Sequence, residues 1–237
     1  MKKSIDYWFD SSIPDDIKKN IELFIPKIVP AKETFPKWFK DIPKYYDGSD
    51  NLRVLESGSN IGIKGCYPFI DSLTSGYVIK LHCDVLVEKG STGNSVNWTH
   101  DIPPIAGRSI SLVGGIPSPS GFSSFEFAWE LYYRLKLPKG YSALFVHPLN
   151  RMDLPFISTS GIVDADGGMA NGSIPFCLDK NFEGIISEGT PIVQIIPFKR
   201  DEWKANYCSL PKELNWNPGK NITGWYKKNI WKRKTYE

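Results

Sequence analysis

Hydrophobic residues occupy every second position over much of the chain between residues 61 and 200. In the segment GYVIKLHCDVLVEKG, alternate residues from Tyr77 to Val87 are apolar, and FAWELYYRLKLPKG repeats this pattern. A period of two is typical of strands with one buried face. Shorter apolar runs bounded by Gly, Pro, Asn or Asp follow, namely YSALFVH, SGIVDAD, GSIPFCLD, FEGIIS and PIVQIIPF. Many short strands at regular spacing predict a mainly β domain, a barrel or sandwich, over residues 61–200.

The first 60 residues follow a different pattern. The segment PDDIKKNIELFI begins with acidic residues and has apolar side chains at Ile17, Ile21 and Phe24, which predicts one short helix. Prolines recur among aromatic residues over positions 30–46, and proline disfavours both helix interiors and central strands. We therefore expect residues 1–60 to form an N-terminal arm with one short helix, whose aromatic side chains wrap over the β core.

The charge distribution sets the C-terminal segment apart. The net charge of the 237-residue chain is +3, yet residues 217–237 contain six basic residues and one acidic residue. That segment carries +5, so the remainder is at −2, which argues against a nucleic-acid-binding surface on the core. We expect residues 201–237 to form a basic tail, in which aromatic and cationic side chains alternate as they do in sites that stack bases and contact phosphates.

The sequence gives no sign of export or of metal binding. No apolar run reaches the length needed to cross a bilayer, and the segment MKKSIDYWFDSSIPDD lacks the apolar region of a signal peptide. The four cysteines show neither CxxC spacing nor pairing with histidines, which argues against a zinc site. We therefore expect a cytoplasmic protein with reduced thiols, no membrane partner and no metal ligand of its own.

Three motifs occur in order over residues 138–198. LPKGY precedes one predicted strand, GIVDADGG ends another, and EGTPIVQ begins a third. Their order and spacing resemble the core of the dUTPase and dCTP deaminase superfamily. The resemblance implies a distorted jelly-roll, or β-clip, core over residues 61–200 and a homotrimer. It also implies a C-terminal arm that closes over the pocket of a neighbouring subunit.

The same resemblance implies a nucleotide pocket. Asp164 matches the family's carboxylate that holds the water attacking the triphosphate, so it would be the catalytic residue if the protein is an enzyme. The resemblance and the side-chain chemistry together give these candidate ligand-binding residues: Asn150, Arg151, Asp164, Asp166, Gln194, Trp225, Lys227 and Arg233. An aspartate at a strand end is also ordinary turn chemistry, so a structural role for Asp164 and Asp166 stays open. No cofactor is expected except magnesium carried by ligand phosphates.

Several positions depart from the family pattern. Leu149 stands where the second motif has an arginine that holds phosphate, and Thr190 and Pro191 replace the Asp-Arg pair of the fourth motif. Glycines replace the tyrosine that follows the third motif, and no glycine-rich fifth motif is visible. Glu183 and Glu188 are carboxylates in a predicted turn, where a solvated role is favoured over that of a deaminase glutamate. These departures argue for a divergent member without ordinary turnover.

Three functions stay open. We favour a nucleotide-binding protein that binds or sequesters a nucleotide or a nucleotide-derived signal without turnover. The many Lys, Asn and Ile residues and the remodelled motifs fit a viral gene, in which case the protein would act in the host cytoplasm in counter-defence. The second hypothesis is an active nucleoside triphosphate pyrophosphatase with a rebuilt phosphate site. The third is a viral structural or assembly protein whose arms connect subunits.

Overall fold

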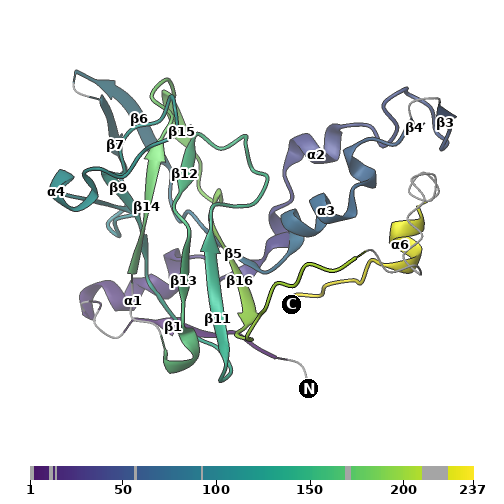
Figure 1. Cartoon of the computed structure of the whole chain (residues 1–237). Helices are drawn as coiled ribbons and strands as arrows, with labels where there is room; N and C mark the ends of the chain where they lie inside the picture. Colours follow the sequence, from purple (N-terminus) through teal and green to yellow (C-terminus); the bar gives the residue numbers. More distant parts are fainter. Residues whose placement is uncertain are drawn as a thin grey trace.

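The computed structural model describes residues 3–10, 13, 15–55, 58–91, 93–168, 172–209 and 224–237. The strands are β1 (Asp6–Phe9), β2 (Val29–Pro30), β3 (Val54–Leu55), β4 (Gly58–Ser59), β5 (Tyr77–Lys80), β6 (Val85–Gly90), β7 (Gly93–Asn97), β8 (Ile105–Gly107), β9 (Phe127–Leu131), β10 (Tyr133–Lys136), β11 (Tyr141–Val146), β12 (Phe156–Ser158), β13 (Gly161–Val163), β14 (Gly172–Leu178), β15 (Gly184–Ile186) and β16 (Pro191–Lys199). The helices are α1 (Asp15–Phe24), α2 (Lys37–Asp41), α3 (Tyr67–Thr74), α4 (Ile110–Val113) and α6 (Trp225–Asn229), with 3-10 turns η1 (Ala31–Thr34), η2 (Ile63–Gly65) and η3 (Ala165–Gly167). The expected mainly β core is confirmed, and short helices lie beside it (Figure 1).

Two antiparallel sheets form the centre of the β core. One has the strand order β13-β11-β16-β5-β2, and the other has the order β12-β14-β9-β8. Apolar side chains from both sheets belong to one buried cluster, in which the Trp129 ring stacks on Phe176 with centroids 3.8 Å apart. The Trp129 Nε1 donates to Ser158 Oγ at 3.0 Å, so its polar atom is satisfied inside the core. The alternation read from the sequence is therefore the alternation between core and surface.

The two longest alternating runs are each broken into two strands. The first gives β5 and β6, and the second gives β9 and β10, which part at Tyr132. Strand β9 pairs with β8 and β14, whereas β10 pairs with β1, so the chain changes sheets at this residue. Trp129, Leu131, Tyr133 and Leu135 are all buried, so the hydrophobic phase continues through the corner.

The N-terminal arm wraps over the core, but largely through aliphatic side chains. Helix α1 is confirmed. Its Ile21, and Ile25 directly after its end, are buried in the central cluster, while Phe24 remains 49% exposed. The expectation that the prolines over 30–46 exclude a helix was wrong. Pro36 directly precedes α2, where the missing N–H of proline leaves no helical hydrogen bond unmade.

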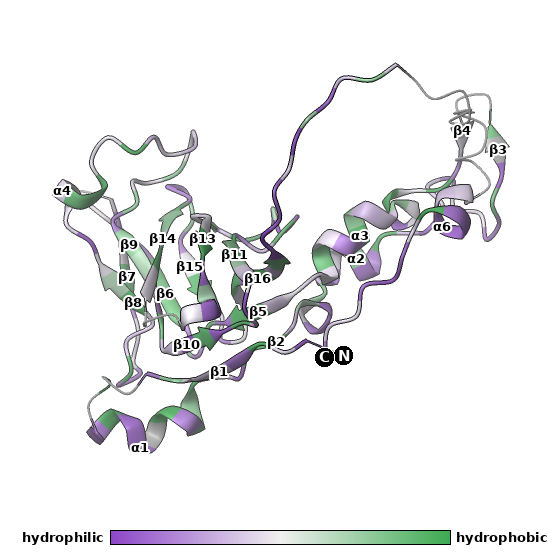
Figure 2. Cartoon of the chain, turned by 60° about the horizontal axis from the view of Figure 1, so that its bottom comes forward, coloured by the Kyte–Doolittle hydropathy of each residue, from purple (hydrophilic) through white to green (hydrophobic). Residues whose placement is uncertain are grey.

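A small helical unit stands beside the β core. It comprises η1, α2 and α3, and the rings of Phe39 on α2 and Phe69 on α3 stack with centroids 6.0 Å apart. Helix α6 of the tail lies near this unit, and Figure 2 shows the extended segment that leaves β16 to run toward it. In the described part of the chain, no helix is both long and apolar enough to span a membrane.

Candidate ligand-binding site

The two aspartates of GIVDADGG lie in a turn that begins at Asp164, directly after β13, and continues through η3. We name residues 164–168 the aspartate turn. The Ser142 hydroxyl donates to Asp164 Oδ1 at 2.6 Å, and Arg200 Nη1 lies 3.1 Å from the same oxygen. Both terminal nitrogens of Arg200 also donate to Asp166. One guanidinium therefore holds both carboxylates.

These contacts keep both carboxylates charged. The Ser142 hydroxyl and then the Arg200 guanidinium lower the pKa of Asp164, whose side chain is 71% exposed. Arg200 and the backbone N–H of Gly140, 3.0 Å from Asp166 Oδ2, lower the pKa of Asp166 to about 2. A lowered pKa makes a carboxylate a weaker general base. Within one chain, both carboxylates therefore fasten the turn to the start of β11 and the end of β16.

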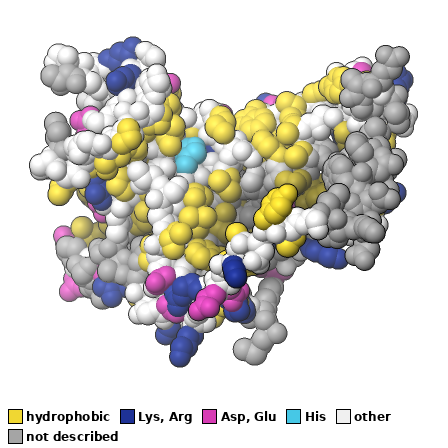
Figure 3. Space-filling view, in the orientation of Figure 1, with side chains coloured by type: hydrophobic (Ala, Val, Ile, Leu, Met, Phe, Trp, Pro, Cys, Tyr) yellow, Lys and Arg dark blue, Asp and Glu magenta, His cyan; other side chains and the backbone are white. Residues whose placement is uncertain are grey.

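Acidic and basic side chains lie side by side at the lower end of the β core in Figure 3, the end at which β11 begins. Hydrophobic side chains instead gather on the face between the core and the helical unit. The aspartate turn therefore belongs to a charged surface in which opposite signs are close together.

The predicted ligand residue Gln194 is buried and makes three hydrogen bonds inside the chain. Its Oε1 accepts from the Leu149 N–H at 2.8 Å, and its Nε2 donates to the carbonyls of Ser72 at 3.0 Å and Ser75 at 2.6 Å. Both amide hydrogens are thus used to join the end of α3 to the turn after β11. Gln194 positions this turn, which carries Asn150 and Arg151.

The turn after β11 holds its two candidate residues by specific contacts. Asn150 has a left-handed backbone with φ of 58°, and its Nδ2 donates to Ser72 Oγ at 2.5 Å. Arg151 makes a paired contact with Asp153, with Nε–Oδ1 and Nη2–Oδ2 distances of 2.8 Å, and a third contact to the Thr34 carbonyl at 3.4 Å. The guanidinium is therefore fixed against η1.

Arg151 lines a pocket of about 460 Å³ between η1, α2, the end of β5 and the start of β16. We name it the cationic pocket, because three basic side chains line it: Lys37, Lys80 and Arg151. The other side chains that matter here are those of Glu33, Phe35, Glu188 and Thr190. Such a lining combines an aromatic ring with cations and carboxylates.

Lys80 differs from the other two cations of this pocket. Lys37 pairs with Asp41 at 2.5 Å, and Arg151 pairs with Asp153, so each has an acidic neighbour. Lys80 is half-buried at the end of β5 and forms no ion pair with any residue that the structure describes. A half-buried ammonium without a carboxylate partner is a suitable contact for an anionic ligand.

The rim of the cationic pocket is a well-fastened turn between β15 and β16. Gly189 has φ of +80°, a conformation that favours glycine, and its N–H donates to the Leu81 carbonyl at 2.8 Å. The Leu81 N–H donates back to the Thr190 carbonyl at 2.8 Å, and the Glu188 N–H donates to Asp84 Oδ1 at 2.7 Å. The pocket wall is therefore held in place before any ligand binds.

The structure separates the predicted site residues into two groups. The aspartate turn contacts Ser142, whereas Gln194 pairs with Val146, four positions further along β11. At the rise of a β-strand, these positions are about 13 Å apart. A single chain therefore does not bring Asp164 and Arg151 into one pocket.

The tail residues Trp225, Lys227 and Arg233 lie away from the cationic pocket of their own chain. Trp225 begins α6, the Lys227 ammonium sits 5.3 Å from the centroid of the Tyr67 ring, and Arg233 is exposed. None of the three lines the pocket. Their predicted contact with a ligand stays a prediction for a neighbouring subunit's pocket.

Sequence reasoning missed Lys80, Phe35 and Arg200. Arg200 directly follows β16, and the antiparallel register of β16 with β11 pairs Lys199 with Tyr141. The order of the motifs along the chain could therefore have placed Arg200 beside the aspartate turn. Lys80 and Phe35 line one pocket only because the N-terminal arm pairs with β5, and no local pattern in the sequence predicts that pairing.

Comparisons with known proteins leave the family open. No protein-family model and no curated protein matches the chain. One similar solved structure is a mutant dUTPase of Staphylococcus bacteriophage 80alpha with dUpNHpp, at 13% identity and a TM-score of 0.32. The match covers 69% of this chain and 91% of the phage protein. A likeness of this size supports no conclusion about function. Among the described residues, no cluster of His, Cys, Asp and Glu could hold a metal ion.

Proposed function

We propose that this protein binds a nucleotide, or a related phosphorylated molecule, in the cationic pocket without hydrolysing it. The observation that carries the proposal is Lys80, a half-buried cation with no ion-pair partner among the described residues, in the same pocket as Arg151. Lys80 and Arg151 would contact phosphate oxygens, and the Phe35 ring would offer an apolar face to a base. The pocket volume of about 460 Å³ is within the usual range for small-molecule sites.

The position of Asp164 supports the proposed lack of turnover. Asp164, the candidate general base, is at the far end of β11 and is already bonded to Ser142 and Arg200. A general base must lie within hydrogen-bond reach of the attacking water. A ligand held by Lys80 and Arg151 would have no such group from Asp164 of the same chain.

Magnesium fits the pocket as a companion of the ligand rather than as a resident ion. Glu33 and Glu188 are exposed carboxylates in the pocket lining. Magnesium is commonly held by one or two carboxylates together with substrate phosphates. The two glutamates would therefore meet a magnesium ion that arrives on the nucleotide.

The test combines binding with turnover. A thermal-shift screen of dUTP, dCTP, ADP-ribose and cyclic dinucleotides with magnesium should give at least one concentration-dependent rise in midpoint. Pyrophosphate release from dUTP and dCTP should be at least about a thousandfold below that of a competent enzyme, the scale of losing positioned charge stabilisation. Ordinary turnover that Asp164→Asn abolishes would favour the pyrophosphatase hypothesis instead.

The segment that follows β16 favours assembly as a second candidate function. Residues 201–209 are exposed throughout, with Trp203 at 89% and Tyr207 at 102% exposure. Large aromatic side chains on an extended segment are candidates for burial against another chain. We propose that they pack on a second copy, in agreement with the expected trimer.

Light scattering checks this assembly proposal. The wild-type chain should have the mass of a trimer at tens of micromolar, and the double variant Trp203→Ser with Tyr207→Ser should shift toward the monomer. The matched control is Leu23→Ser, because Leu23 is also exposed but lies on α1. A wild-type monomer, or a double variant with unchanged mass, would rule out a role for this segment in assembly.

A further inference from the structure

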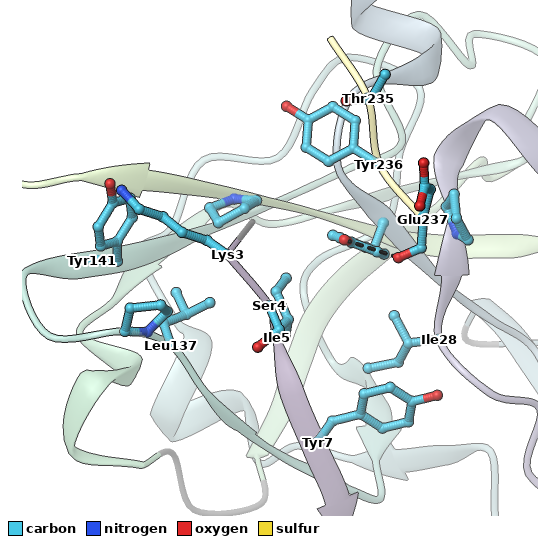
Figure 4. A pocket seen from close by; sticks show the side chains of 14 residues that line it. Lys3, Ser4, Ile5, Tyr7, Ile28, Leu137, Tyr141, Thr235, Tyr236 and Glu237 are labelled. Atoms are coloured by element: carbon cyan, nitrogen blue, oxygen red, sulfur yellow. Dashed lines mark hydrogen bonds between the residues drawn. The ribbon is translucent and has the colours of Figure 1, made fainter. Parts of the chain in front are cut away.

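A second and larger pocket, of about 810 Å³, lies where β1, the start of β11 and the end of the tail meet (Figure 4). Its lining shares no residue with the cationic pocket. Four tyrosine rings surround it, so we name it the tyrosine pocket; they are Tyr7, Tyr77, Tyr141 and Tyr236. Its volume suits a small molecule of several rings.

The interior of the tyrosine pocket is apolar and aromatic. Ile5, Ile28 and Leu137 supply aliphatic surface, and prolines complete the lining. Tyr77 and Tyr236 meet edge to face, with centroids 5.8 Å apart. Apolar walls and aromatic faces favour a planar ring system, which stacks on tyrosine and loses little conformational freedom on binding.

The polar groups of the pocket indicate the charge of its ligand. The Lys3 ammonium lies 4.0 Å from the centroid of the Tyr141 ring. In the described part of the chain, the hydroxyls of Tyr7 and Tyr141 have no hydrogen-bond partner. An acidic group on the ligand would meet the Lys3 ammonium and the Tyr141 hydroxyl, which lie on the opposite side of the pocket from Glu237 (Figure 4).

The last residues of the tail cover one side of this pocket. Asp71 on α3 accepts from Trp231 Nε1 at 2.9 Å and from Lys234 Nζ at 2.5 Å. Beyond that anchor, residues 235–237 line the pocket, and the Tyr77 hydroxyl donates to the Glu237 carbonyl at 3.3 Å. One carboxylate outside the pocket therefore holds the segment that covers it.

We propose that the tyrosine pocket binds a planar aromatic molecule carrying one acidic group, and that residues 231–237 cover the bound molecule. The site is separate from the cationic pocket, so it stands whether or not nucleotides bind there. Lys3 contacts the acidic group, the tyrosine rings contact the aromatic face, and Asp71 fixes the cover.

Calorimetry on the full chain tests the ligand class with 2-naphthoate and its uncharged analogue 2-naphthamide. Both should bind saturably, with naphthoate about fivefold tighter, the scale of one exposed ion pair. Lys3→Gln should remove that preference, whereas Lys139→Gln, which changes a neighbouring lysine outside the pocket lining, should preserve it. A preference that survives Lys3→Gln, or no saturable binding of either probe, would overturn the proposal.

A bulky side chain placed in the tyrosine pocket independently tests whether the probes bind there. Ser4 is an exposed residue of the lining, so Ser4→Trp places an indole in the pocket without changing the core. It should weaken both probes by about tenfold or more, because the ring takes the volume they need. Ser4→Ala should leave both affinities unchanged. Equal affinities in Ser4→Trp and the wild type would place the bound probe elsewhere.

The covering segment is tested by the rate at which naphthoate leaves. Asp71→Ala should speed its dissociation by at least about tenfold in a stopped-flow competition, the scale of losing a charged hydrogen bond. Asp41→Ala is the matched control, because it removes an exposed carboxylate from α2, outside the pocket. Equal dissociation rates in Asp71→Ala and the wild type would contradict the covering role.

Discussion

Charged side chains lie near both ends of strand β11, but they are paired within the chain only near its start. At the start of the strand, Arg200 contacts both Asp164 and Asp166, so the carboxylates and the guanidinium satisfy one another. Beyond its other end, Arg151 is paired with Asp153, but Lys80 lines the same pocket without an ion-pair partner among the described residues. The first arrangement is complete within the chain, whereas the second leaves a cation for a ligand.

On the proposed function, the motif and the binding site do not coincide. The aspartates carry the stronger sequence signal, yet their contacts serve the turn. Lys80 carries no motif signal, yet it sits in a preformed pocket. Charged side chains that are paired within the chain therefore support the fold, whereas a charged side chain without such a partner can bind a ligand.

Substitution of Gln194 should have the largest effect, a loss of stability, because Gln194 holds the turn that bears Arg151. Gln194→Leu leaves the Leu149 N–H and the Ser72 and Ser75 carbonyls without their partner, which should lower the free energy of unfolding by about 2–4 kcal/mol. Urea denaturation measures this loss. Asn181→Leu, in the exposed turn after β14, is the control and should change stability by less than about 0.5 kcal/mol. Similar losses in both variants would contradict the structural role of Gln194.

The next largest effect should come from Arg151 and concern ligand affinity. Arg151→Ala should weaken nucleotide binding by about 1.5–3 kcal/mol, the scale of a charged hydrogen bond. Calorimetry with the best nucleotide from the thermal-shift screen provides the measurement. Arg53→Ala changes an exposed arginine outside the pocket and should bind normally. If both variants bind equally well, Arg151 is a structural residue only.

If the tail reaches a neighbouring subunit's pocket, it should make a smaller, salt-dependent contribution to the free energy of nucleotide binding. Removing residues 224–237 should then weaken nucleotide binding by about 1 kcal/mol at low salt, because exposed charges each contribute little. It should also flatten the dependence of affinity on ionic strength, since the tail supplies the screened long-range attraction. An unchanged salt dependence would remove Trp225, Lys227 and Arg233 from the ligand site.

The aspartate turn should affect the stability of the protein at low pH rather than the affinity for a ligand. The pKa of Asp166 is about 2 in the folded chain, mainly because of Arg200, and about 4 in an unfolded one. Its contribution to stability is therefore complete above about pH 4 and is lost as the pH falls toward 2. Arg200→Ala should flatten the stability profile across this window, as measured by denaturation at several pH values. Lys199→Ala, at the neighbouring position, should keep the slope, and an equally steep Arg200→Ala profile would refute the coupling.

The sequence predicted the β core and the location of the motifs better than it predicted the site. Short apolar runs bounded by turn residues are a local signal, and they correctly placed β11, β13, β14 and β16. The bonds of Gln194 reach Leu149, Ser72 and Ser75, which lie from 45 to 122 positions away in the chain, so no local pattern contains them. The cationic pocket likewise depends on an N-terminal segment that packs across β5.

The most direct test of the account compares Lys80→Gln with Asp164→Asn in calorimetric titrations of the best nucleotide from the thermal-shift screen. Each variant removes one charge and keeps a side chain of similar size. Lys80→Gln should weaken binding by about 1.5–3 kcal/mol, whereas Asp164→Asn should change it by less than about 0.5 kcal/mol. Normal binding by Lys80→Gln together with weak binding by Asp164→Asn would place the ligand at the aspartate turn and contradict the account.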